Sequence, residues 1–139
     1  MIGDSKQINS VLLIDDDDVV NTLHSIILRQ SGLVENIQSV LSGSEALSIL
    51  SACEKDQCWP SIIFVDINMP GMNGWEFMEC FNKKFFANKH KCKVCLLSSS
   101  LDPRDKEKAD KLKFVDFYFS KPLVPENVKT VCKELSVSI

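Results

Sequence analysis

Short apolar segments alternate along the chain with longer segments in which apolar residues recur every three or four positions. The short segments are apolar almost without interruption, which is typical of strands that are buried on both faces of a parallel sheet. We expect five such strands, at residues 10–14, 36–41, 61–65, 93–97 and 116–120. The longer segments predict five amphipathic helices, at residues 18–31, 44–54, 75–86, 104–113 and 125–135.

Five strands that alternate with five helices predict a parallel sheet with helices on both faces. The predicted fold class is therefore α/β, a doubly wound five-stranded parallel sheet of the flavodoxin-like (βα)5 type, with strand order 2-1-3-4-5. A chain of 139 residues suits a single domain. We expect residues 1–9 to form a short N-terminal tail and residues 10–139 to form one domain, with no further domain.

Two of the predicted helices carry additional signals. In the first helix, Val20, Leu23 and Ile27 fall on one stripe, which is the pattern of a helix with one buried face. Before the fourth helix, Asp102 is a favourable N-cap residue and Pro103 suits the first helical position. These signals predict the buried face of the first helix and the start of the fourth.

The composition excludes several classes of protein. With 45% hydrophobic and 25% charged residues, the chain is close to the average of soluble globular proteins. Sixteen basic residues against nineteen acidic ones give no basic excess, so we expect no direct binding of nucleic acid. No apolar run is long enough to span a membrane, and the first apolar run ends in four aspartates rather than in a cleavage site. We therefore expect a cytoplasmic protein without membrane insertion.

The six cysteines do not form a recognisable framework. Cys92 and Cys95 have a spacing that occurs in zinc sites, but zinc usually takes four ligands and the other cysteines are scattered. We therefore expect buried free thiols rather than structural zinc or disulfides.

Polar residues stand at the ends of four of the five predicted strands. Asp15 and Asp16 follow the first strand, Asp66 follows the third, Ser98 the fourth and Lys121 the fifth. Taken singly, each has an ordinary explanation as a helix-dipole, turn or surface residue. Because ligands of doubly wound sheets bind outside the carboxyl ends of the strands, we expect these groups to share one crevice.

The combination of these groups indicates phosphoryl chemistry. Three carboxylates in one crevice repel each other and stay ionised together only with a cation among them. Oxygen ligands suit Mg²⁺, with Mn²⁺ as an alternative. A lysine and a hydroxyl beside them could hold phosphoryl oxygens while a carboxylate attacks phosphorus. The sequence therefore predicts a phosphoryl-acceptor site.

Four motifs in the predicted order carry a resemblance to a known family. They are Val11-Leu12-Leu13-Ile14-Asp15-Asp16, Ile63-Phe64-Val65-Asp66-Ile67-Asn68-Met69-Pro70-Gly71-Met72-Asn73-Gly74, Leu97-Ser98-Ser99 and Tyr118-Phe119-Ser120-Lys121-Pro122. Through them the chain resembles a response-regulator receiver domain of bacterial two-component systems, close in plan to the single-domain chemotaxis regulator. The resemblance covers residues 10–135, nearly the whole chain.

The resemblance implies a set of metal-binding roles. Asp66 would be the phosphoacceptor and also a ligand of Mg²⁺. Asp16 would bind Mg²⁺ directly, Asp15 would act nearby through water, and the backbone carbonyl of Asn68 would complete the protein ligands. Because four aspartates follow one another, a slip of one residue would exchange the roles of Asp15 and Asp16.

The resemblance also implies roles for groups around the phosphoryl oxygens. Ser98 would hydrogen bond to the phosphoryl group, and Lys121 would form an ion pair with it. Tyr118 stands at the aromatic switch position and would move together with Ser98. The alternative is that Tyr118 is only a strand aromatic with a solvated hydroxyl. The family commonly bends the chain here through a cis proline, so we expect a cis peptide bond between Lys121 and Pro122.

The function implied is a signalling switch rather than an enzyme, although such a domain assists its own phosphorylation and dephosphorylation. The phosphodonor would be a histidine kinase or a histidine phosphotransfer protein. Output would be onward phosphotransfer or binding of a protein target through helix 104–113, strand 116–120 and helix 125–135.

Two alternatives stay open at this stage. One is a Mg²⁺-dependent phosphatase of the haloacid-dehalogenase type, which usually carries a second Asp where this chain has Asn68. The other is a receiver-like module that binds partners without phosphate. The complete set of acidic residues argues against this alternative, because repelling carboxylates without a use are an electrostatic cost.

Overall fold

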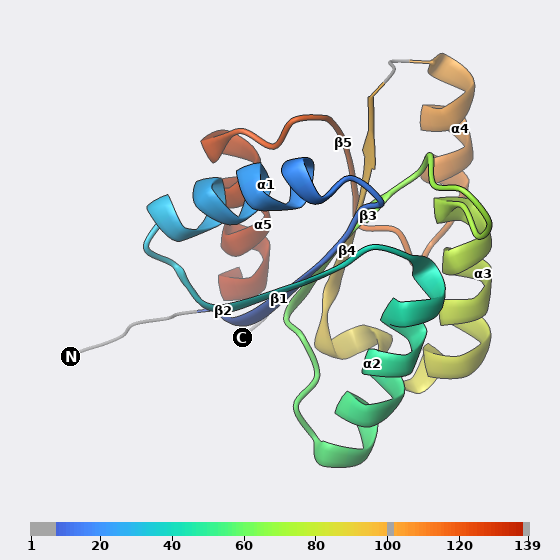
Figure 1. Ribbon diagram of the computed structural model, residues 1–139, viewed down its shortest axis with the longest axis horizontal. Helices are drawn as coiled ribbons and strands as arrows, with labels where there is room; N and C mark the ends of the chain where they lie inside the picture. The colour runs from blue at the N-terminus through green and yellow to red at the C-terminus, as the bar shows by residue number, and fades with distance from the viewer. Residues whose placement is uncertain (1–7, 100–101, 138–139) are drawn as a thin grey trace.

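The computed structural model describes residues 8–99 and 102–137, in which five strands alternate with five α-helices (Figure 1). The strands are β1 (Ile8–Ile14), β2 (Val34–Val40), β3 (Ile62–Asp66), β4 (Lys93–Ser98) and β5 (Phe117–Ser120). The helices are α1 (Asp18–Gln30), α2 (Gly43–Asp56), α3 (Gly74–Phe85), α4 (Pro103–Lys111) and α5 (Pro125–Val137), with a 3₁₀ helix, η1 (Phe86–Lys91), after α3.

All five strands are parallel and their order is β2-β1-β3-β4-β5, which confirms the predicted fold class and strand order. The register aligns the carboxyl ends of the strands: Ile14 lies opposite Val65, and Ser98 lies opposite Ser120. Asp15, Asp66 and Lys121 therefore leave the sheet at the same edge.

Helices cover both faces of the sheet. In Figure 1, α1 and α5 lie together on one face, and α2, α3 and α4 lie on the other. Alternate strand residues pack against the helices on opposite faces of the sheet. Leu12 belongs to a cluster with Phe77 and Phe81 of α3. Its neighbour Val11 belongs to a cluster with Leu28 of α1 and Val131 of α5. Burial on both faces explains why the strands are apolar without alternation.

The buried face of α1 differs from the prediction. Its buried residues are Asn21, His24 and Leu28, whereas Leu23, expected on the buried stripe, is 41% exposed. The reason is that α1 packs over the carboxyl end of β1, where backbone groups of other segments need hydrogen-bond partners. Asn21 and His24 supply those partners.

Several element boundaries also differ from expectation. β1 begins at Ile8, inside the segment expected to be a tail, because it pairs with Val34 at the start of β2. The remainder of that expected tail, residues 1–7, lies outside the described residues. η1 was not predicted, since a single short 3₁₀ segment has no amphipathic period. In the described ranges, no helix has the length and apolarity that crossing a bilayer requires.

All six cysteines are free thiols, as expected. Cys92 and Cys95 are buried in different clusters, one on each face of the sheet, so the pair does not converge on one ion. The expectation of burial is wrong for Cys58, which is exposed in the loop after α2, and Cys53 and Cys80 are only partly buried.

Candidate functional site

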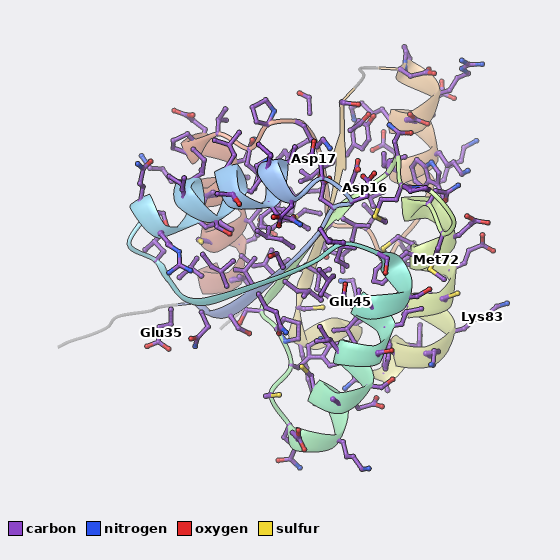
Figure 2. The ribbon with its side chains drawn as sticks, in the orientation of Figure 1. Asp16, Asp17, Glu35, Glu45, Met72 and Lys83 are labelled. Carbon is purple, nitrogen blue, oxygen red and sulfur yellow. The ribbon has the colours of Figure 1, made fainter. Side chains whose placement is uncertain are left out.

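The loop after β1 turns the chain sharply into α1. The carboxylate of Asp15 is buried and accepts a hydrogen bond of 2.9 Å from the amide of Asp17. Asp17 in turn caps α1 by accepting a hydrogen bond of 2.9 Å from the amide of Val19. Asp16 lies between them and is exposed at the surface (Figure 2).

Asn21 fixes this loop, and sequence reasoning missed it. Its buried side-chain amide donates to the backbone carbonyl of Asp15 at 3.0 Å and to that of Val40 at 3.3 Å. Asn21 thereby joins α1 to the ends of β1 and β2 and holds Asp15 in place. The available signal was its spacing from Leu28, which places both residues on one helical face.

Asp66 ends β3 and is almost completely buried. Its Oδ1 atom accepts a hydrogen bond of 3.2 Å from the amide of Asn68, which lies in the exposed loop beyond the strand. Gly74 closes this loop through a hydrogen bond of 2.8 Å from its amide to the carbonyl of Ile67. A Cβ atom at position 74 would lie 2.7 Å from the Asp66 carbonyl oxygen, so the loop requires glycine there.

Lys121 follows the last residue of β5, and its side chain reaches the carboxylates of Asp15 and Asp66. Its amide donates to the carbonyl of Ser98 at 2.8 Å, and the following bond to Pro122 is cis, as predicted. Its ammonium Nζ lies 2.9 Å from Oδ2 of Asp15 and 3.4 Å from Oδ1 of Asp66. The lysine thus bridges two buried carboxylates.

Three of the predicted acidic residues converge. One carboxylate oxygen from each of Asp15, Asp16 and Asp66 lies within 4.8 Å of the other two. Burial raises the pKa of Asp66 to about 6, the charge of Asp15 adds to this, and Lys121 opposes it. Burial alone would lower the pKa of Lys121, but the two carboxylates raise it. One ammonium among three carboxylates leaves an excess of negative charge, which fits a hard divalent cation.

Ser98 and Tyr118 lie on the neighbouring strands β4 and β5. Ser98 ends β4 and is completely buried. Tyr118 of β5 packs against the cluster of apolar residues that contains Leu96, its neighbour on β4. Its hydroxyl is buried and has no hydrogen-bond partner among the described residues, which contradicts the alternative of a solvated hydroxyl.

His24 is a second polar residue of α1 with a role that the sequence did not reveal. Its Nε2 atom accepts a hydrogen bond of 3.2 Å from the amide of Leu123, just beyond the cis proline. Burial lowers the pKa of His24, although the nearby Asp15 opposes the shift. His24 therefore connects α1 to the segment that leads into α5.

Comparison with known proteins agrees with this arrangement. The family model described as response regulator receiver domain matches residues 11–133. A two-component response regulator from Cytophaga hutchinsonii is 49% identical to this chain, with a TM-score of 0.93. That match covers 95% of this chain and 99% of the other.

Two more distant structures share the fold. A response regulator receiver protein from Dyadobacter fermentans is 23% identical, with a TM-score of 0.81 and coverage of 91% of this chain and 98% of that one. The chemotaxis protein CheY4 from Vibrio cholerae is 23% identical, with a TM-score of 0.69 and coverage of 95% and 99%. By its family model and its 49% identity to a response regulator, this chain belongs to the receiver domain family of two-component signalling systems.

Proposed function

We propose that this chain is a phosphorylation switch in which Asp66 accepts a phosphoryl group from a histidine kinase or a histidine phosphotransfer protein. The observation that carries the proposal is the convergence of Asp15, Asp16 and Asp66 around one ammonium, that of Lys121. Family membership supports a switch rather than a phosphatase, as does Asn68, which cannot shuttle a proton where such phosphatases usually carry Asp.

In the proposed transfer, a carboxylate oxygen of Asp66 attacks phosphorus as the bond from phosphorus to the donor nitrogen breaks. The polar contacts of the Asp66 carboxylate with described residues are made by Oδ1, so Oδ2 is available for attack. Lys121 would neutralise charge on the transferred oxygens, and the hydroxyl of Ser98 would donate to one of them. The leaving imidazole takes up a proton from solvent.

Asp15, Asp16, Asp66 and the backbone carbonyl of Asn68 would hold Mg²⁺, or Mn²⁺ in its place. When bound, the cation supplies positive charge beside the reacting oxygens. The raised pKa of Asp66, about 6, supports this assignment, because it reports an environment that disfavours a carboxylate without added positive charge. Asp16, the exposed member of the cluster, is open to a metal ion arriving from solvent.

The outer face of α1 would receive the phosphodonor. Val19, Leu23 and Ile26 form an exposed apolar stripe on α1, with Val19 being 76% exposed. The stripe begins immediately after the loop that carries Asp15, Asp16 and Asp17. A donor protein packed on the stripe would therefore lie beside Asp66. Exposed apolar side chains in one row are typical of a protein-binding surface.

Output would follow from a shift of Tyr118 and α4. The Tyr118 hydroxyl has no partner among the described residues, so its buried position is held by ring packing alone and is easy to bias. A hydrogen bond from Ser98 to the phosphoryl group would change the space behind β4 that this ring uses. A target would recognise the surface of helix 104–113, strand 116–120 and helix 125–135 through its different affinity for the two states.

The test is incubation with acetyl phosphate and Mg²⁺, followed by intact-mass measurement. We expect a gain of one phosphoryl group that EDTA prevents and that Asp66→Asn abolishes. Asp56→Asn, at an exposed position on α2, is the matched control and should be labelled as the wild type is. Equal labelling of the Asp66→Asn variant would overturn the assignment.

A further inference from the structure

A cavity of about 430 Å³ opens at the end of the sheet opposite to the acidic cluster. It is formed by the end of α3, by η1, and by the end of α4 with the turn that follows it. η1 precedes β4 and this turn precedes β5, whereas the acidic cluster stands beyond the carboxyl ends of the strands. The cavity thus shares no residue with the proposed phosphoacceptor site.

One part of this cavity is apolar. Phe86, the first residue of η1, is 75% exposed at its rim, which is unusual for an aromatic side chain. Leu112 and Phe114 are partly buried and also line the cavity, and Phe114 packs against the main core. Leu112 and Phe114 thus form an apolar floor, and a ligand with a large apolar side chain would cover both this floor and Phe86.

One wall of the cavity is fixed by a half-buried ion pair. The ammonium of Lys89 lies 2.8 Å from Oδ2 of Asp116 and 3.3 Å from the carbonyl oxygen of Cys92. The same Asp116 oxygen accepts a hydrogen bond of 2.8 Å from the amide of Val94. These contacts join η1 to the segment before β5, so this wall of the cavity is already formed before a ligand binds.

The remaining lysines of the cavity carry uncompensated charge. Lys111 and Lys113 are exposed, and neither pairs with a carboxylate in the described part of the chain. The nearest carboxylates in sequence on either side already have partners: Asp110 pairs with Lys106 at 3.3 Å, and Asp116 pairs with Lys89. The cavity therefore presents two free ammonium groups beside an apolar surface.

The charge of the surrounding segment has the same sign. Residues 83–113 contain ten of the sixteen Lys and Arg residues of the chain, but only four of its nineteen Asp and Glu residues. Lys83 of α3 follows the cavity residue Asn82 in the sequence, and its side chain points away from the ribbon in Figure 2. The rest of the chain is strongly acidic, so an acidic ligand would be attracted to this segment and repelled elsewhere.

We propose that this cavity binds an acidic segment of a partner protein, with a large apolar side chain packed against Phe86 and carboxylates paired with Lys111 and Lys113. The ligand must be amphipathic, because the two free ammonium groups flank an apolar floor instead of forming a row that could follow a phosphate backbone. The site goes beyond the proposed switch. It shares residues 111–113 with the proposed output surface, but Phe86 and Lys89 of η1 lie outside that surface, and we expect binding without phosphorylation.

The probe is a short fluorescein-labelled peptide in which Asp and Glu residues flank a central Phe, titrated with the full chain in a fluorescence anisotropy assay. Two matched peptides separate the contributions: one has Ala in place of Phe, and the other has Asn and Gln in place of the acidic residues. We expect the first peptide to bind about tenfold or more tightly than either control. Its affinity should fall as salt concentration rises.

Variants of the chain test the same residues from the protein side. The pair Lys111→Gln with Lys113→Gln, and separately Phe86→Ser, should each weaken peptide binding about tenfold or more. The pair Lys129→Gln with Lys133→Gln, at exposed positions on α5, removes the same charge elsewhere and should bind as the wild type does. Since all five positions are exposed, the variants should melt at the wild-type temperature and be labelled normally by acetyl phosphate.

Four results would overturn the proposal. The first is wild-type affinity in both cavity variants. The second is loss of affinity in the lysine pair but not in Phe86→Ser, together with equally tight binding of single-stranded RNA, which would indicate general attraction of polyanions. The third is concentration-dependent self-association that Phe86→Ser abolishes, which would make a second copy of this chain the occupant. The fourth is binding that requires beryllofluoride and Mg²⁺, which would assign the cavity to the output surface.

Discussion

At the scale of single residues, the site is built around a carboxyl group that the fold makes unstable as an anion. Asp66 is buried and has a pKa of about 6, above the ordinary value of 3.8. The folded protein therefore binds this proton more tightly than the unfolded chain does. Without a cation, ionised Asp66 destabilises the fold; the cost is fully present above pH 6 and disappears below about pH 4.

Asp66→Asn should therefore stabilise the metal-free protein by roughly 1–3 kcal/mol at pH 7.5. The amide keeps an oxygen for the hydrogen bond from Asn68 while removing the charge. The measurement is urea denaturation in EDTA between pH 4 and 8, where the gain should shrink as the pH falls. Asp56→Asn is the control and should show no such trend. A variant less stable than the wild type at pH 7.5 would show that the ionised carboxylate stabilises the fold.

A second residue-scale prediction concerns the Tyr118 hydroxyl, which is buried without a partner among the described residues. Removing an unsatisfied buried hydroxyl avoids its desolvation cost, so Tyr118→Phe should leave stability unchanged or raise it by about 1 kcal/mol. Thermal melting measures this, and labelling by acetyl phosphate should not change. A loss of more than about 1 kcal/mol would mean that the hydroxyl makes a stabilising hydrogen bond.

At the scale of elements, α1 buries two polar side chains and exposes three apolar ones. Its inner face buries the polar residues Asn21 and His24, and its outer face exposes Val19, Leu23 and Ile26. The inner residues satisfy backbone groups of β1, β2 and the segment before α5. The outer stripe has no such structural use, which is why we assign it to the phosphodonor.

Ile26→Glu should slow phosphotransfer from a protein donor about tenfold or more, because it places a charge within the apolar stripe. The donor is a phosphorylated histidine phosphotransfer protein chosen because it labels the wild-type chain. Labelling by acetyl phosphate, which needs no docking surface, serves as the internal control and should be unchanged. Equal slowing with both donors would place the defect in Asp66 chemistry instead of docking.

The same helix shows what could be predicted from the sequence and what could not. The five strands and the convergence of Asp15, Asp66 and Lys121 follow from apolar runs and from the rule that parallel strands end at one edge. The buried face of α1 was predicted wrongly because Leu23 fits an apolar period better than Asn21 does. Asn21 and His24 are buried through contacts with the backbone of Val40 and Leu123, which are distant in sequence. The spacing of Asn21 from Leu28 places both residues on one helical face, but it does not reveal those contacts.

At the scale of the whole molecule, a bound cation should act as a ligand of the folded state alone. Mg²⁺ should raise the melting temperature, with a stabilisation near 2.7 kcal/mol when its concentration is one hundred times Kd. Asp16→Asn should reduce this response, since Asp16 contributes one of the three converging carboxylates. Melting curves with and without Mg²⁺ measure the effect, and Asp56→Asn should respond as the wild type does. An unchanged response in Asp16→Asn would transfer the ligand role to a neighbour, with Asp15 the first candidate.

The hydrogen bond from the Leu123 amide to His24 has a consequence for how the partners of this protein affect one another. It ties the helix proposed to receive the phosphodonor to the segment that leads into α5, part of the proposed output surface. A target that displaces Leu123 would alter α1, and thus the affinity for the donor. Thermodynamic linkage makes the coupling reciprocal, so the donor would change the affinity for the target by the same factor. The fraction of this protein bound to either partner would therefore depend on the concentration of the other partner, even before phosphoryl transfer.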